Sequence, residues 1–353
     1  MKDFSGRLIA WHRRHGRHDL PWQRTRDPYP VWLSEIMLQQ TQVGTVIPYY
    51  QRFLARFPDV AGLARASMED VMRLWAGLGY YSRARNLHRA ARAIVDEHGG
   101  AFPASRHALQ ALPGVGRSTA AAITVFAFGA REAILDGNVK RVLARQFAVS
   151  GLPGNTALEN TLWSLAESLV PDRAVETYTQ ALMDLGATVC TRALPGCEHC
   201  PLASSCVALA RGRVAAYPTP RPRRTAPVRS VAMLLLLREG KILLEKRPPS
   251  GIWGGLWSFP EMPADGEVQA HCAAQLGCEV GMPVALQPLR HGFTHFTLDI
   301  RPCRCEVRRL MPRAGEPGRA WFTLEQARDA GVPAPVRKLL GRLPGAAREG
   351  QSP

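Results

Sequence analysis

The chain has 353 residues, of which 46% are hydrophobic and 21% are charged. This length suits a globular protein with two cored domains, and no apolar run reaches the roughly 18 residues that a membrane span requires. Lys and Arg together number 45 against 29 for Asp and Glu, which gives a net charge of +16. Most of the excess is arginine, which binds phosphates as a planar fork, so nucleic acid is the first partner to consider.

The first residues, MKDFSGRLIAWHRRHGR, are polar and amphipathic. They lack the apolar core of an export signal, so we expect a cytoplasmic protein with no membrane partner. Eight cysteines in such a reducing compartment predict metal ligands or free thiols instead of a disulfide framework.

The first 190 residues predict helices joined by connections of modest length. A first helix is expected over Phe4–His15, and a helical stretch over residues 31–57 with a break near Pro48. Glu35 lies in that stretch among apolar residues. An ionised carboxylate is costly in apolar surroundings, so Glu35 is turned outward, satisfied by a partner, or functional with a raised pKa.

Residues 108–128 predict two helices joined by a tight turn that contains Gly114 and Gly116. Glycines permit positive φ and let a ligand approach the backbone, and the free N–H groups that open the second helix suit an anion. The alternative is an ordinary helix–helix connection. Asp136 follows as an isolated carboxylate, and it could be the N-cap of the next helix.

Four cysteines then occur with the spacing C-x6-C-x2-C-x5-C, at Cys190, Cys197, Cys200 and Cys206. Four clustered thiolates can hold one zinc ion or the four irons of a cubane cluster. The spacing predicts a metal site and leaves the choice between zinc and iron–sulfur open.

Residues 217–228 are basic and rich in proline, which predicts a semi-rigid linker. Beyond it, strands are expected around Glu239-Gly240 and over 291–310, and helices over 268–276, 324–329 and 335–343. The fold class is therefore multidomain. An all-α region over 1–216 precedes an α+β domain over 229–343 and a tail, 344–353.

The chain resembles the helix-hairpin-helix DNA glycosylase superfamily, and within it the MutY family of adenine glycosylases. The resemblance is carried, in order, by VWLSEIMLQQTQV, GLGYYSRARNL, LPGVGRSTA, LDGNVKRV and the four-cysteine run. RPPSGIWGGLWSFP and RHGFTHFTLDI resemble that family's Nudix-like C-terminal domain, which recognises 8-oxoguanine. The resemblance thus spans essentially the whole chain and implies an all-α helix-hairpin-helix domain followed by an α+β Nudix-like domain.

For the site, the resemblance implies a [4Fe-4S] cluster on Cys190, Cys197, Cys200 and Cys206. It implies a monomer that works at the bacterial nucleoid on double-stranded DNA containing A:8-oxoguanine or A:G mispairs. The expected reaction flips the mispaired adenine out of the helix and hydrolyses its N-glycosidic bond, as a step of base excision repair.

That reaction needs two carboxylates in different protonation states. Adenine leaves more easily once a ring nitrogen is protonated, and Glu35 fits a general acid whose pKa is raised by apolar neighbours. The sugar develops positive charge, which an ionised carboxylate can stabilise or capture, and Asp136 matches the family's residue for this role. Asn138 and Ser118 match positions that line the family's active site.

Contacts to DNA and to the lesion also follow from the resemblance. Gly114, Val115 and Gly116 are expected to grip phosphates, and Gln40, Thr41, Leu78 and Tyr80 to contact the 8-oxoguanine or wedge beside it. Phe293, Thr294 and His295 match a lesion-reading loop in which the family usually has Phe-Ser-His. The alternative for Tyr80 is a capping and packing role, and for His295 a strand position on a solvent face.

Ser118 stands where relatives of the endonuclease III type, which also cleave the strand, carry a lysine nucleophile. Without that amine no Schiff base forms there, so a monofunctional glycosylase is expected. The alternatives are an endonuclease III-like glycosylase/lyase for oxidised pyrimidines and a DNA-damage binding module without catalysis. Retention of both Glu35 and Asp136 disfavours the second alternative. Nucleotide hydrolysis is disfavoured because EVQAHCAAQLGCEV lacks the paired glutamates of a Nudix helix.

Overall fold

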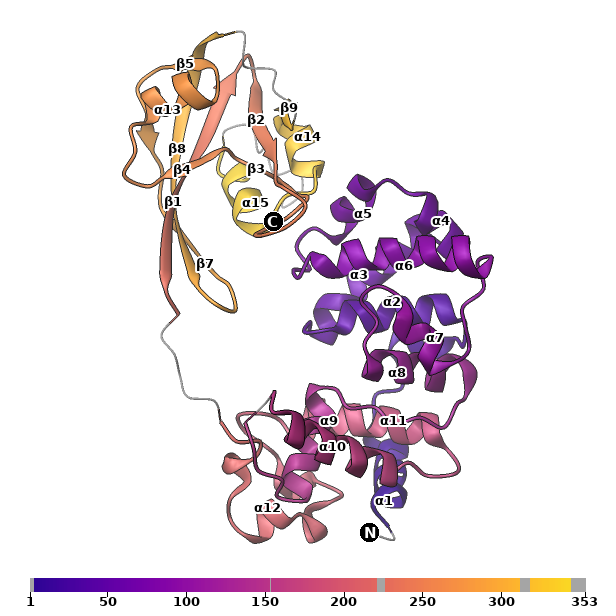
Figure 1. Ribbon diagram of the computed structural model, residues 1–353. Helices are drawn as coiled ribbons and strands as arrows, with labels where there is room; N and C mark the ends of the chain where they lie inside the picture. Colours follow the sequence, from indigo (N-terminus) through magenta and orange to yellow (C-terminus); the bar gives the residue numbers. More distant parts are fainter. Residues whose placement is uncertain (1–2, 153, 221–225, 312–317, 344–353) are drawn as a thin grey trace, which may run out of the picture. The chain divides into compact units, whose positions relative to one another are not determined.

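The computed structural model describes residues 3–152, 154–220, 226–311 and 318–343 (Figure 1). The chain forms two compact units, one made of residues 1–65 and 86–223 and the other of residues 66–85 and 224–353. The predicted tail, 344–353, and residues 221–225 of the predicted linker lie outside the described residues. No helix in the described ranges is long and apolar enough to cross a membrane.

The described part of the first unit is helical, which confirms the predicted all-α class. Its longer helices are α1 (Phe4–His15), α2 (Pro28–Leu38), α3 (Val43–Arg56), α4 (Val60–Arg65), α6 (Ser82–His98, which begins in the second unit), α7 (Arg106–Ala111), α8 (Arg117–Phe128), α9 (Gly137–Gln146), α10 (Thr156–Ser168), α11 (Val175–Asp184) and α12 (Val207–Ala210). Short helical turns are η1 (Pro21–Arg24), η2 (Leu185–Val189), η3 (Cys197–His199), η4 (Ala203–Ser205) and η5 (Val214–Ala216).

The break between α2 and α3 does not lie where the sequence predicts it. Pro48 is inside α3, and the chain instead breaks over residues 39–42. The cause is Gln40, whose φ of 57° is left-handed and cannot continue a right-handed helix. Pro48 is the sixth residue of α3, and the helix continues past it without the N–H donor that proline lacks. The expected position of the break was therefore wrong by several residues.

One hydrophobic core of the first unit lies between α1, α9 and α11. Leu8 of α1, Leu143 of α9 and Leu182 of α11 are almost fully buried in one apolar cluster. Each such side chain contributes about 1.5–3 kcal/mol when it is removed from water. Leu202, in the cysteine loop, belongs to the same cluster. The core therefore holds the N-terminus of α9 and the cysteine loop in fixed positions.

The second unit contains α5 (Met68–Trp75) and a mixed sheet with three further helices, as the α+β prediction requires. Its elements are β1 (Val228–Arg238), β2 (Lys241–Lys246), β3 (Trp257–Ser258), β4 (Glu261–Pro263), α13 (Val268–Gln275), β5 (Cys278–Val280), β6 (Val284–Ala285), β7 (Leu289–Gly292), β8 (Thr297–Leu310), β9 (Arg319–Thr323), α14 (Leu324–Asp329) and α15 (Ala334–Leu340). The path of the sheet is β3-β2-β1-β8-β5, with β1 and β8 parallel.

The central strand β1 is buried without interruption from Ala232 to Leu236. A continuous apolar run indicates that both faces of the strand are covered, and Figure 1 shows α13 on one side of the sheet and α14 and α15 on the other. Glu239 and Gly240 both have positive φ and close the predicted hairpin between β1 and β2. The second unit is thus a sheet between helices.

The four cysteines outside the cysteine loop lie on α13, β5 and β8 but share one core. Cys272, Cys278 and Cys305 are buried in the cluster between α13 and the sheet, and the half-buried Cys303 packs against it. These residues act as small apolar side chains in that core.

Candidate active site

A cavity of the first unit has a volume of about 1330 Å³. It is bordered by η1, the C-terminal half of α2, the 39–42 break, the start of α8, the start of α9 and α11. Ligand sites for small molecules usually enclose about 300–1,000 Å³. This cavity therefore has room for a ligand of nucleotide size.

Glu35 reaches the cavity from α2. The helix begins where the Asp27 side chain accepts the N–H of Tyr29 at 2.9 Å, and Pro28 fits its first position. Seven of the eleven residues of α2 are buried, which leaves Glu35 half-buried in an apolar wall. Burial, and secondly the charge of Asp136, raise the pKa of Glu35 to about 8. Glu35 therefore carries a proton at neutral pH.

Asp136 borders the same cavity from the N-terminus of α9. Its Oδ1 accepts the N–H of Val139 at 2.8 Å, so the N-cap expected from sequence is present. Burial raises the pKa of Asp136, but backbone N–H groups of Val139 and Asn138 and the charge of Arg141 oppose the shift. These donors favour the ionised form, and none of them acts on Glu35.

Asn138 and Ser118 join the two carboxylates in the cavity lining. Asn138 Nδ2 lies 3.3 Å from Asp136 Oδ2 and donates to it. Ser118 Oγ accepts the backbone N–H of Leu135 at 2.9 Å. Ser118 therefore fixes the segment that leads into Asp136.

The hairpin between α7 and α8 forms as predicted. Gly114 has a φ of 80°, and a Cβ there would lie 2.7 Å from Asn86 Cβ, so both conformation and space require glycine. Gly116, the N-cap of α8, is exposed and a Cβ would meet nothing within 4 Å. Val115 differs from both, because its side chain is buried and its N–H donates to Leu112 O at 3.1 Å.

The residues expected to meet the lesion fall into two groups. Gln40 and Thr41 line the cavity of the first unit. Leu78 and Tyr80 belong to the second unit, where Leu78 is buried, while Tyr80 has a φ of 49° and is 45% exposed.

The turn between β7 and β8 contains Phe293, Thr294 and His295. The Phe293 ring stacks on Phe296 with centroids 4.5 Å apart, and Phe293 N–H donates to Phe296 O at 2.8 Å. Thr294 and His295 are exposed at the tip of this turn. His295 thus lies in a turn and not within a strand.

The cysteine loop encloses a small cavity of its own. Cys190, Cys197, Cys200 and Cys206 all line it, together with Arg145. Arg145 Nη1 donates to Cys190 Sγ at 3.3 Å. Burial raises the pKa of the Cys200 thiol to about 11, so its thiolate needs a bound cation. Within the described ranges, no three ligating side chains converge on the position of a single ion.

Known protein families match both parts of the chain. A family model described as "HhH-GPD superfamily base excision DNA repair protein" matches residues 33–168, and one described as "NUDIX domain" matches residues 231–342. An adenine DNA glycosylase of Buchnera aphidicola is 35% identical over 337 residues, which cover 95% of each chain. The human adenine DNA glycosylase is 36% identical over 97% of this chain and 75% of its own.

This chain belongs to the adenine DNA glycosylase family. A solved structure of a thermostable thymine-DNA glycosylase is 31% identical to it, with a TM-score of 0.54, over 60% of this chain and 96% of that one. Within the family, the predicted division into a helical glycosylase fold and a Nudix-like sheet domain is confirmed.

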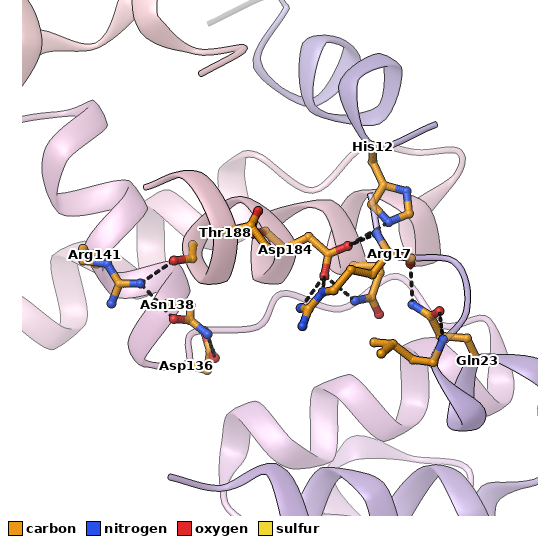
Figure 2. Close-up of polar contacts among 11 residues, drawn as sticks. His12, Arg17, Gln23, Asp136, Asn138, Arg141, Asp184 and Thr188 are labelled. Atoms are coloured by element: carbon orange, nitrogen blue, oxygen red, sulfur yellow. Dashed lines mark hydrogen bonds and ion pairs between the residues drawn. The ribbon is translucent and has the colours of Figure 1, made fainter. Parts of the chain in front are cut away.

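The sequence analysis did not identify two polar residues near the site, Arg141 and Asp184 (Figure 2). Arg141 donates to Asn138 Oδ1 at 2.9 Å and to the backbone O of Cys190 and Gly186 at 2.8 and 2.6 Å. Asp184, at the end of α11, is buried and accepts hydrogen bonds from Arg17. In the sequence, Asp184 is indicated only by its position as a carboxylate within the apolar run MDLG.

Proposed function

We propose that this adenine DNA glycosylase removes adenine mispaired with 8-oxoguanine or guanine in duplex DNA, without cleaving the strand. The observation that carries the proposal is the pairing of Glu35 and Asp136 across one cavity, in a chain of this family. The mispaired adenine would leave the stack and enter the cavity, because a glycosidic bond inside the helix is not accessible to side chains.

Glu35 would donate its proton to a ring nitrogen of the adenine. A pKa of about 8 leaves the carboxyl mostly protonated at pH 7 and close enough to neutrality for transfer. The protonated base then departs with the electrons of the glycosidic bond.

Asp136 would stabilise the positive charge that develops on the sugar as the base leaves. Asn138 would hold the Asp136 carboxylate, and Ser118 would hold the backbone that carries it. Water completes the reaction by adding to the sugar carbon, and the proton that it loses returns to the Glu35 carboxylate. Ser118 offers no amine, so a lyase step through a Schiff base at this position is not part of the proposal.

The hairpin would bind the DNA backbone beside the flipped nucleotide. Gly114 and Gly116 are exposed and leave the backbone open to a phosphate, and α8 begins directly after them. Val115 would serve by packing the hairpin into the fold, since its side chain is buried.

We propose further that Gln40, Thr41, Leu78 and Tyr80 meet the 8-oxoguanine or its neighbours, and that the turn with Phe293, Thr294 and His295 reads the lesion. The exposure of His295 at a turn held by Phe293 and Phe296 supports this. His295→Ala should lower the preference for 8-oxoguanine over guanine opposite adenine, while His271→Ala, on α13, should not. An unchanged preference in His295→Ala would contradict a role of this turn.

We propose that Cys190, Cys197, Cys200 and Cys206 hold a [4Fe-4S] cluster. The four thiols line one small cavity, and the resemblance to a family whose cysteine run holds such a cluster supports iron–sulfur over zinc. The bound cluster would fix the loop as a structural unit. Iron and sulfide analysis of anaerobically purified protein should find four of each per chain, and stoichiometric zinc would contradict this assignment.

The protein would act as a monomer on chromosomal DNA in the bacterial cytoplasm. Its net charge of +16 supports contact with DNA along more than the lesion itself.

The decisive experiment is single-turnover release of adenine from a duplex with one A:8-oxoguanine pair. Glu35→Gln should lower the rate by about 10²–10⁴-fold, because the proton donor is lost while the shape is kept. Glu97→Gln, an exposed glutamate of α6, serves as the matched control and should retain the wild-type rate. Absence of release by the wild type, or a Glu35→Gln rate equal to it, would overturn the proposal.

A further inference from the structure

Asp184 is a buried carboxylate that the proposed chemistry does not use. It ends α11, and its side chain is 1% exposed. Its Oδ2 accepts the backbone N–H of Arg17 at 2.8 Å, and its Oδ1 accepts Arg17 Nε at 2.9 Å. His12 Nε2 lies 3.3 Å from Oδ2 (Figure 2). Arg17 and its neighbours therefore hold the carboxylate in one orientation.

The charge of Asp184 is also maintained. Burial by itself would raise the pKa of Asp184, but His12 and Arg17 outweigh burial, and the pKa lies below its ordinary value. An ionised carboxylate accepts hydrogen bonds and donates none.

Gln180 lies one turn before Asp184 on α11 and lines the cavity that contains Glu35 and Asp136. Its Nε2 donates to Asp184 Oδ1 at 2.8 Å. If the amide were turned over, Gln180 Oε1 would face a carboxylate oxygen of Asp184, and two acceptors would meet. The carboxylate therefore favours the orientation in which Nε2 points to it. With Nε2 bonded to Asp184, Oε1 is the other polar atom of the Gln180 amide.

We infer that Asp184 is a positioning residue that fixes the polarity of the Gln180 amide, so that the cavity meets an acceptor, Oε1, and not a donor. This inference rests on the proposed function and specifies how the base is chosen. An acceptor pairs with the exocyclic amino group of adenine. It opposes the 6-oxo group of guanine or hypoxanthine, which is itself an acceptor.

Arg17 has a second part in this arrangement. Gln23 Nε2 donates to Arg17 O at 2.9 Å, and Gln23 Oε1 accepts the N–H of Leu20 at 3.2 Å. Arg17, Leu20 and Gln23 line the same cavity as Gln180. The ion pair with Asp184 therefore holds two walls of the cavity together, one from α11 and one from the segment after α1.

The test compares single-turnover release of adenine and hypoxanthine, each opposite 8-oxoguanine, in wild type and Asp184→Asn. Asparagine can donate as well as accept, so the Gln180 amide becomes free to turn. The ratio of adenine to hypoxanthine release should fall by at least about 10-fold, since one hydrogen bond is weakened for one base and gained for the other. Taking the ratio relative to wild type removes the intrinsic difference between the two leaving groups.

The melting temperature of Asp184→Asn shows whether this variant is folded. Two further variants test the inference if it is not. Gln180→Met removes the amide and leaves the Asp184–Arg17 pair intact, and it should also lower the ratio. Asp172→Asn, on an exposed ion pair with Arg131, is the control and should keep both rates.

Equal losses for both bases in Asp184→Asn, with an unchanged ratio in Gln180→Met, would overturn the inference and leave Asp184 a purely structural residue. Conversely, a lowered ratio in both variants would support it. If the wild type released neither base, the proposed function itself would fail, and that outcome is distinct from an unchanged ratio in an active enzyme.

Discussion

The α2 wall and the α9 wall of the cavity each supply one carboxylate, and they treat it in opposite ways. Around Glu35, α2 offers apolar neighbours, and burial raises the pKa of that carboxyl to about 8. Around Asp136, the first turn of α9 offers backbone N–H groups and the charge of Arg141, which favour ionisation against burial. Burial raises the pKa of both carboxyls, but only the helix N-terminus around Asp136 opposes that rise with donors that favour the ionised form.

After Glu35→Gln, the largest effect is expected from removing the charge on the α9 side. Asp136→Asn keeps an N-cap that can accept the N–H of Val139, so the fold should be retained. Adenine release in a single turnover should fall by about 10²–10³-fold, because the developing charge on the sugar loses its counter-charge. Asp172→Asn is the charge control. A variant that kept the wild-type rate would show that Asp136 acts only as a cap.

A smaller effect is expected from adding a methyl group at Gly186, where η2 packs against the first turn of α9. A Cβ at Gly186 would lie 2.6 Å from Asn138 Cβ and 3.1 Å from its Cα. Gly186→Ala must therefore push α9 away from η2, at a loss of about 1–3 kcal/mol in the free energy of unfolding. The measurement is denaturant unfolding, with Gly44→Ala in α3 as the control, since a Cβ there meets nothing within 4 Å. Equal stability of Gly186→Ala and wild type would refute the tight contact.

The smallest effect is expected at Ser118. Ser118→Ala leaves the buried N–H of Leu135 without its acceptor, which should lower the free energy of unfolding by about 1 kcal/mol and the release rate modestly. Ser164→Ala, whose hydroxyl bonds only within exposed α10, should change neither. A Ser118→Ala protein as stable and active as wild type would count against the role of Ser118 in fixing the segment before Asp136.

What the sequence predicted and what it missed have a common physical origin. The hairpin at Gly114 and the N-cap at Asp136 are local, because turn and cap chemistry depends on residues a few positions apart. The break near Pro48 was predicted wrongly, because it depends on the left-handed conformation of Gln40, which no residue type there demands.

The contacts that the sequence could not reveal join segments far apart. Arg17 and Asp184 are separated by 167 positions, and Arg141 and Cys190 by 49. Only the packing of α1, α9 and α11 brings these residues together. A single sequence carries the type of each residue but not these pairings, so Asp184 and Arg141 could be found only in the folded chain.

The pH dependence of single-turnover adenine release tests the contrast between the two walls most directly. Glu35 can donate only while protonated, so its contribution is complete below its pKa and is lost as the pH rises through about 8. The account predicts a rate that is level near pH 7 and falls about tenfold per pH unit above pH 9. A rate that stayed level up to pH 10, or that rose with pH, would contradict a protonated Glu35 as the acid.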